Sequence, residues 1–395
     1  MPASTPNLSS SPEAATRIRS WLEARCDEMV ELLVRLVEAE SPTTEPSTHR
    51  EVCSILTGEL QALGFEVARI PGNEVGDHLV ALGSPQPGPG QLLLGHFDTV
   101  WPLGTLDSMP AKIEDGRLHG PGAYDMKAGL VQGLFALQAI GAAGLTPSLP
   151  VTAFLNADEE IGSPDSRRKL DELSRESERA FVLEPSAGAR GNLKTARKGV
   201  GGFEVRIHGK ASHAGLAPGE GASAIVEASH QIQRLFALND PERGTTVNVG
   251  TIDGGIGANV VAPEVVLEID VRVTSAEDMA AVEAGIRALE PQTEGVSLDV
   301  QGGFRRPPLE RTERNRALWR QAVDAAQAVG IELDEALVGG GSDGNLASVH
   351  TATLDGLGAV GDGAHAVFEH VVIERMPERA ALLAMLLLAP PDGVR

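Results

Sequence analysis

The spacing of apolar residues changes twice along the chain, and this change limits the possible folds more than any other feature. Up to about residue 200, short apolar runs such as 91–97 and 150–157 alternate with stretches of helical spacing such as 126–142. This alternation is typical of a layered α/β domain, whose sheet can be mixed rather than wholly parallel. The same pattern resumes after Pro307 and Pro308. We therefore expect both ends of the chain to build one α/β domain.

The middle of the chain shows the two-residue alternation of half-buried strands. The alternation is clearest in one run, Val265, Leu267, Ile269, Val271 and Val273. Together with two segments of helical spacing, the strands give the order βαββαβ, a ferredoxin-like unit. We expect this unit to span residues 201–305, inserted between residues 1–200 and 306–395 of the larger domain. Its two open sheet edges favour pairing with a second copy, so the pattern predicts a homodimer.

Helical spacing also predicts one helix from Pro12 to Glu40 and a last helix from Pro377 to Leu388. The two cysteines, Cys26 and Cys53, both fall in helical segments. Two cysteines cannot build a disulfide framework, so we expect buried thiols in a reducing compartment.

Charge and hydropathy exclude several functional classes. Lys and Arg number 33 against 55 Asp and Glu, and the formal net charge of -22 repels nucleic acids and anionic membranes. The longest apolar run, residues 380–389, is about half of the ~20 residues that a membrane-spanning helix needs. The N-terminal residues show no apolar segment behind a basic stretch, which predicts a cytoplasmic protein without a secretory signal.

Acidic and imidazole side chains follow the predicted strands at the points where the apolar runs end. In open α/β sheets, ligands bind at the carboxyl ends of the strands, so we expect these side chains to share one site. Two further members come from glycine-rich loops. The whole set is His96, Asp98, Asp125, Asp158, Glu159, Glu160, Glu184 and His365.

Two histidines and several carboxylates without a cysteine form a ligand set for zinc, manganese or cobalt. The carboxylates are more than one tetrahedral zinc ion can use, which indicates two metals. If Asp125 bridges them, one ion takes His96 and Glu184, and the other takes Glu160 and His365. Glu159 is then left unligated, as suits the general base that removes a proton from water.

Asp98 has two possible roles. It can accept a hydrogen bond from the second ring nitrogen of His96 and so orient that ring, or it can cap the turn that follows it.

Each of these motifs alone is common in proteins, because acidic runs such as 158–160 are often solvated faces. Gly356, Gly358 and Gly361 form the G-x-G-x-x-G pattern of dinucleotide-binding proteins, but they lie too near the C-terminus for a complete nucleotide-binding half. A non-catalytic binding protein on the same scaffold is disfavoured because every metal and base position is filled.

Seven motifs occur in order over nearly the whole chain: GHFDTV, GPGAYDMKAGLV, NADEEIGS, VLEPS, GKASHAG, GGGSDGN and GDGAHAVFE. Together they resemble the dinuclear zinc peptidase family of glutamate carboxypeptidase, aminoacylase and succinyl-diaminopimelate desuccinylase. Within it, the chain is most similar to bacterial glutamate carboxypeptidases.

The resemblance implies a role for each matching residue. Two zinc ions, replaceable by cobalt or manganese, would be held by His96, Asp125, Glu160, Glu184 and His365, with Glu159 as the base and Asp98 orienting His96. His213 in the inserted domain would reach the active site of the partner subunit and stabilise the oxyanion. The family pattern of a histidine followed four residues later by a glutamate selects His365 over His370, and His119 is expected to be structural.

The implied reaction is hydrolysis of an amide bond next to a free carboxylate in a peptide or an N-acyl amino acid. It would release a C-terminal amino acid, for which we expect glutamate; an aminoacylase or dipeptidase with another preference is the alternative. A guanidinium group binds such a carboxylate well, so Arg305 and Arg306 are candidates, although one of them can simply keep the hinge soluble. By resemblance, the same pocket would contain Asn259, Gly340 and Ser342.

Overall fold

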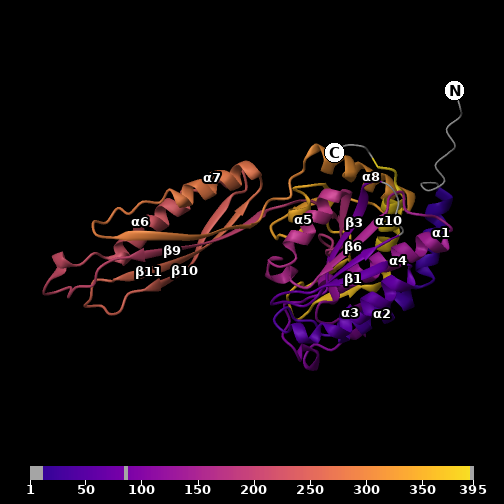
Figure 1. Cartoon of the computed structure of the whole chain (residues 1–395), viewed down its shortest axis with the longest axis horizontal. Helices are drawn as coiled ribbons and strands as arrows, with labels where there is room; N and C mark the ends of the chain where they lie inside the picture. Colours follow the sequence, from indigo (N-terminus) through magenta and orange to yellow (C-terminus); the bar gives the residue numbers. More distant parts are fainter. Residues whose placement is uncertain (1–11, 84–87, 392–395) are drawn as a thin grey trace. The chain divides into compact units, whose positions relative to one another are not determined.

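The computed structural model describes residues 12–83 and 88–391, and these divide into two compact units (Figure 1). Unit 1 consists of the described parts of Met1–Ala196, Arg311–Leu337 and Ser342–Arg395. Unit 2 consists of Arg197–Glu310 and Val338–Gly341.

Unit 1 is built around a six-stranded mixed sheet, and the prediction of a layered α/β domain is confirmed. The strand order is β1 (Glu66–Ile70), β2 (His78–Leu82), β6 (Val151–Asn156), β3 (Gly90–His96), β7 (Ser177–Val182) and β14 (Ala352–Leu354). The four strands from β6 to β14 are parallel, whereas β1 and β2 pair antiparallel. The parallel strands therefore end at one common edge.

Helices cover both faces of this sheet and form two separate cores. One face packs against α1 (Pro12–Glu23), α2 (Cys26–Glu38), α3 (Arg50–Ala62), α4 (Ala128–Ala142), α8 (Glu313–Ala328) and α10 (Met376–Leu388). The other face packs against α5 (Arg167–Glu176) and α9 (Asp343–Ala347). Successive residues of a strand point to opposite faces, so Leu93 belongs to the first core and Leu94 to the second.

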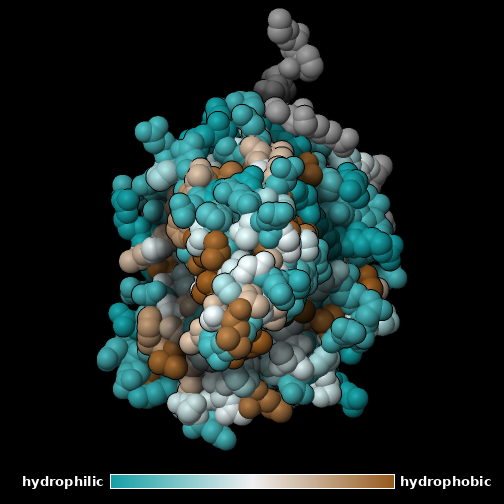
Figure 2. Space-filling view, turned by 90° about the vertical axis from the view of Figure 1, so that its left-hand side faces the viewer, coloured by the Kyte–Doolittle hydropathy of each residue, from teal (hydrophilic) through white to brown (hydrophobic). Residues whose placement is uncertain are grey.

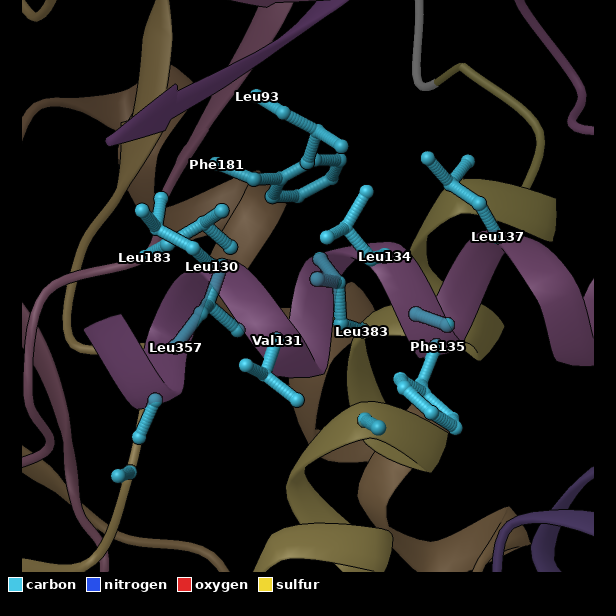
Figure 3. Packing of buried hydrophobic residues seen from close by; sticks show 14 of the residues in the cluster. Leu93, Leu130, Val131, Leu134, Phe135, Leu137, Phe181, Leu183, Leu357 and Leu383 are labelled. Carbon is cyan, nitrogen blue, oxygen red and sulfur yellow. The ribbon is translucent and has the colours of Figure 1, made fainter. Parts of the chain in front are cut away.

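Helix α4 is apolar on all sides because it lies between two layers. In Figure 3, Leu130 and Leu134 point toward Leu93 and Phe181 of the sheet, and Val131 and Phe135 point away from it, toward α10. A helix buried on every side needs no polar face. Its N-terminal end follows the loop that carries Asp125.

Two smaller sheets complete the strands outside the main sheet and unit 2. A four-stranded sheet has the order β15 (Gly361–Asp362), β16 (His370–Val372), β5 (Arg117–His119) and β4 (Lys112–Glu114). A two-stranded sheet pairs β13 (Glu335–Val338) with β8 (Leu193–Arg197).

Unit 2 has the ferredoxin-like order that the sequence predicts. Its elements are β9 (Gly199–His208), α6 (Ala224–Phe236), β10 (Thr246–Gly254), β11 (Glu264–Val273), α7 (Ala276–Arg287) and β12 (Ser297–Arg306). They form an antiparallel sheet of order β10-β11-β9-β12, with alternate residues of β9 and β11 in a core under the two helices. Figure 2 shows brown hydrophobic side chains scattered among teal hydrophilic ones on the side that faces the viewer.

The predicted single helix from Pro12 to Glu40 is wrong, because it is two helices, α1 and α2. Arg25 leaves the helical conformation, with φ -120° and ψ 18°, and its amide bonds back to the carbonyl of Leu22. Both helices keep their apolar faces in one core, so the hydrophobic spacing does not reveal the break. Over the described ranges, no helix is both long and apolar enough to cross a membrane.

Candidate metal centre

The predicted acidic and imidazole residues of unit 1 meet at the edge where the parallel strands end. His96 is the last residue of β3, and its register partner Asn156 is the last residue of β6. Glu159 and Glu160 follow Asn156 closely, and Glu184 comes two residues after the end of β7. The topology therefore explains why residues far apart in sequence gather here.

Asp125 lies between the two histidines and presents one carboxylate oxygen to each. Its Oδ1 is 3.3 Å from Nε2 of His96, and its Oδ2 is 3.5 Å from Nε2 of His365. The loop that carries Asp125 turns at Gly120 and Gly122, whose φ angles of 151° and 70° favour glycine. The carboxylate of Asp125 therefore joins His96 and His365 in one cluster.

Each histidine has a second carboxylate beside it. Oε1 of Glu184 is 3.6 Å from Nε2 of His96, and Oε2 of Glu160 is 3.1 Å from Nε2 of His365. Possible ligand atoms of His96, Glu159 and Glu184 all lie within 4.8 Å of one another. The same holds for a second set, from His96, Asp125 and Glu160. The side chain of Glu159 therefore lies at this centre.

Several polar atoms of the centre are buried without a hydrogen-bond partner. They are Nε2 of His96, Oδ1 of Asp125 and Oε1 of Glu160. Buried polar atoms in folded proteins are almost always satisfied, so three such atoms on residues whose possible ligand atoms lie within 4.8 Å of one another need a physical cause. A cation bound among them would satisfy all three, which fits the nitrogen and oxygen donors present.

The pKa values of the centre reflect its packed opposite charges. Hydrogen bonds with Asp125 and Glu160 raise the pKa of His365 to about 10. Burial lowers the pKa of His96, but the neighbouring carboxylates of Asp125, Asp98 and Glu184 outweigh it and raise that pKa above its usual value. Burial raises the pKa of Asp125, yet the two histidines together lower it. Without metal, the centre therefore holds a proton on His365 at neutral pH.

Asp98 contacts both His96 and the acidic turn after β6. Nδ1 of His96 donates to the main-chain carbonyl of Asp98 at 3.0 Å, and the carboxylate lies 3.4 Å away. The two carboxylate oxygens accept the main-chain amides of Glu159 and Glu160, each at 3.3 Å. The predicted contact between Asp98 and His96 is present, although the shorter of the two distances is to the main-chain carbonyl of Asp98 and not to its carboxylate. The turn that the Asp98 carboxylate caps is the one that carries Glu159 and Glu160.

Glu369 is a buried residue of this site that the sequence patterns alone did not single out. Its carboxylate accepts four hydrogen bonds, from the main-chain amides of Gly122, Tyr124 and Asp125 and from the indole of Trp101. Burial raises its pKa to about 7. The sequence signal that could have found Glu369 is the family pattern of a histidine, here His365, followed four residues later by a glutamate. In the structure, this glutamate fixes the loop that carries Asp125.

The G-x-G-x-x-G pattern reflects close packing in this fold. A Cβ atom on Gly358 would lie 2.3 Å from the carbonyl oxygen of Leu183, and one on Gly361 would lie 2.1 Å from that of His370. The buried guanidinium of Arg379 donates to the carbonyls of Gly356 and Gly358 at 2.6 and 3.1 Å. The glycines therefore allow close approach of the chain beside Glu184 rather than of a nucleotide.

His213 and Asn259 lie together in unit 2. His213 pairs with Val260 in an isolated bridge, and the amide of Ala214 donates to the carbonyl of Asn259 at 2.9 Å. Nδ1 of His213 accepts the amides of Gly215 and Leu216, both at 3.1 Å. The ring proton is then on Nε2, which leaves that nitrogen as a hydrogen-bond donor.

The remaining predicted residues have mixed surroundings. Arg305 is exposed and Arg306 buried at the end of β12, and Gly340 belongs to unit 2. Ser342 is buried in unit 1, where its hydroxyl caps α9 and donates to Asp355 at 2.5 Å. Its side chain is therefore already engaged in capping.

His370 stands apart from the centre. It pairs with His119 across β16 and β5, with ring centroids 5.3 Å apart, as expected for a residue that is not a ligand.

Comparison with known proteins adds independent information. The model of the peptidase family M20/M25/M40 matches residues 92–389. Carboxypeptidase G2 of Pseudomonas sp. (strain RS-16) is 30% identical over 390 residues, covering 95% of this chain and 93% of that protein. These findings confirm the family resemblance of the motifs.

Solved structures share the fold. The aminopeptidase PepT of Bacillus cereus has a TM-score of 0.75 and 24% identity, covering 92% of this chain and 98% of that one. A Bacillus subtilis protein described as a dinuclear metal-binding peptidase of the M20 family has a TM-score of 0.65 and 15% identity, with coverage of 92% and 98%.

Proposed function

The chain belongs to the M20/M25/M40 peptidase family and is a metallohydrolase, and we propose that it uses two metal ions to hydrolyse an amide bond next to a free carboxylate. The observation that carries the proposal is the position of Asp125, with one oxygen toward each histidine. The product would be a C-terminal amino acid, and the 30% identity to carboxypeptidase G2 favours glutamate. An aminoacylase or dipeptidase of different preference is the alternative.

The five proposed metal ligands are His96, Asp125, Glu160, Glu184 and His365. The unpartnered buried atoms of His96, Asp125 and Glu160 support this assignment. We propose zinc as the metal, with cobalt or manganese as substitutes, because the donors are imidazole and carboxylate. When bound, such ions polarise a carbonyl group and make water more acidic.

Glu159 is proposed as the general base. The main-chain amide of Glu159 is fixed by Asp98, while a carboxylate oxygen lies within 4.8 Å of ligand atoms of His96 and Glu184. A carboxylate at this position takes the proton of the attacking water and then gives it to the leaving amine. One residue thereby serves both halves of the reaction.

His213 is proposed to donate a hydrogen bond from Nε2 to the developing oxyanion at the active site of the second subunit of a homodimer. Two features of unit 2 support such a dimer. Strand β10 is an edge strand, and α6 exposes Ile225, Val226 and Phe236 with about half of each residue accessible (51%, 49% and 48%). A monomer in analytical ultracentrifugation at micromolar concentration would contradict this part of the proposal.

Arg305 or Arg306 is proposed to bind the substrate carboxylate through two parallel hydrogen bonds, with Asn259, Gly340 and Ser342 in the same pocket. The exposed Arg305 is the more accessible of the two.

The predicted cytoplasmic location stays a prediction, since it rests partly on residues 1–11, which lie outside the described ranges.

The test is amino-acid release by the zinc-loaded protein from amides that share one acyl group and differ in the C-terminal residue. A matched substrate carries a primary amide in place of the free carboxylate. We expect the carboxylate form to react and glutamate to be preferred by about tenfold or more, roughly 1.4 kcal/mol of transition-state binding. Equal turnover of the blocked substrate would contradict carboxylate recognition, and another preferred residue would favour the alternative.

A further inference from the structure

The acidic turn, which we define as residues 157–166, carries the proposed base and one proposed ligand. It is closed internally by Asp158, whose carboxylate accepts the amides of Asp165 and Ser166 at 2.8 and 3.1 Å. The carbonyl of Asp158 accepts the amide of Ser163 at 2.8 Å. These bonds shape the turn but do not fix it to the rest of unit 1.

Asp98 fixes the start of the turn by accepting the amides of Glu159 and Glu160, and Asp343 provides a second fixed point. Asp343 is buried at the first position of α9, about 180 residues beyond the turn, with 5% of its surface exposed. One carboxylate oxygen accepts the hydroxyl of Ser163 in the turn. The other accepts the side-chain amide of Asn156 at 2.6 Å, and that amide also donates to the hydroxyl of Ser166 at 3.0 Å.

Helix α9 is itself held firmly in unit 1. Ser342 caps it and donates to Asp355 at 2.5 Å, while Asn345 closes the capping box. Leu346 and Ala347 pack in a core with Leu170 of α5. In the GGGSDGN motif, Ser342 and Asn345 therefore cap α9, whereas the side chain of Asp343 contacts the acidic turn.

In this contact the carboxylate of Asp343 is the acceptor on both sides. Ser163 and Asn156 both donate to an ionised carboxylate, one to each oxygen. An amide at position 343 can keep the bond from Asn156 through its oxygen, but it replaces the charged acceptor of the Ser163 hydroxyl with an N–H group, so the hydroxyl must turn round to accept and the charge-assisted bond is lost. Asn156 is also the register partner of His96 in the sheet. The same carboxylate thus connects the turn of Glu159 and Glu160 to the strand end beside His96.

We infer that Asp343 is a positioning residue that holds the acidic turn, and with it Glu159, in the geometry needed for turnover. The inference rests on the function proposed above. A misplacement of about 1 Å in a catalytic group can reduce the rate by about a hundredfold. The two hydrogen bonds that Asp343 accepts from Ser163 and Asn156, which we call the latch, should therefore affect kcat more than KM.

The test compares four proteins: wild type, Asp343→Asn, Asn156→Asp and the double variant. The double variant exchanges amide and carboxylate across the 2.6 Å bond, and every donor again faces an acceptor. We expect Asp343→Asn to lower kcat by roughly ten- to a hundredfold with KM within about twofold, and the double variant to recover most of the loss.

A second readout needs no turnover. Hydrogen exchange of peptides within residues 157–166 should be faster in Asp343→Asn and return toward the wild-type rate in the double variant, with or without zinc. Glu227→Gln is the matched control, since Glu227 in unit 2 is a buried carboxylate that accepts from a glutamine side chain and main-chain amides. It should leave exchange in the acidic turn unchanged.

Wild-type kcat and wild-type exchange in folded Asp343→Asn would overturn the inference. If that variant does not fold, Ser163→Ala removes one of the two bonds and serves in its place, and unchanged exchange and kcat there would overturn it equally. Absence of amide hydrolysis in the wild-type protein would count against the proposed function instead, because the exchange measurement still reports on the latch.

Discussion

The carboxylate of Glu369 accepts a hydrogen bond of 3.0 Å from the main-chain amide of Asp125. Asp125 is the residue between the two histidines, so Glu369 fixes the loop on which both proposed metal positions depend. Such groups behind the ligands commonly contribute ten- to a hundredfold to metal affinity.

We expect Glu369→Gln to weaken zinc binding by about ten- to a hundredfold, because an amide can replace only part of the four accepted bonds. Competition with a chelator measures the affinity. Glu374→Gln, at an exposed position of the same region, is the control and should bind zinc normally. Normal affinity in Glu369→Gln would contradict the role of this anchor.

The two histidines near the C-terminus should behave differently. His365→Ala removes a group 3.1 Å from Glu160 and 3.5 Å from Asp125, so one of the two ions should be lost. His370→Ala removes a ring contact with His119 and a hydrogen bond to the carbonyl of Phe368, but no proposed ligand, and should keep both ions. Metal content after dialysis, measured by mass spectrometry, distinguishes the two, and loss of metal in His370→Ala would reverse the assignment.

Glu159→Ala should lower kcat by about a thousandfold or more while both ions stay bound, because the proton acceptor is removed but no proposed ligand is. The measurement is steady-state release of the amino acid together with metal content. Near-normal turnover would exclude Glu159 as the base, and loss of metal would make it a ligand.

Metal binding should release protons. Without metal, hydrogen bonds with Asp125 and Glu160 raise the pKa of His365 to about 10, so this ring is protonated at pH 7, and the pKa of His96 is raised as well. Zinc needs neutral imidazole, so affinity should rise with pH. Calorimetry in buffers of different ionisation enthalpy should show protons released as zinc binds, with His365 alone contributing about one per chain. Release of no protons would contradict the prediction that His365 is protonated and paired with Asp125 and Glu160 in the metal-free protein.

The same pKa values predict how the metal-free protein responds to pH. A histidine whose pKa is raised on folding stabilises the fold fully below its unfolded pKa of about 6.5, and this contribution is lost as the pH rises toward 10. The melting temperature of the metal-free protein should therefore fall over this range. With zinc bound, the rings are already neutral and the dependence should be much weaker, so equal pH profiles of the two forms would contradict the prediction.

Much of the fold and the centre could be predicted because their signals are local. Alternating residues mark the strands of unit 2, His96 ends a strand, and Glu184 follows another closely. Parallel strands end at one edge, and so the candidate ligands could be grouped from the sequence alone.

Other features depend on contacts that leave no periodic pattern. The break at Arg25 between α1 and α2 involves no glycine or proline. The apolar residues of both helices belong to one core, so the hydrophobic spacing continues across the break. Glu369 and Asp343 act by accepting hydrogen bonds from distant segments, so only the folded chain reveals their partners. His213 and Arg305 belong to unit 2, and their parts in the reaction stay predictions.

The most direct test of the two-metal account is titration of the metal-free protein with zinc while amino-acid release from an N-acyl amino acid is followed. We predict no hydrolysis without metal and a maximal rate at two zinc ions per chain. Full activity in the metal-free protein, or saturation of both binding and activity at one ion, would contradict the account.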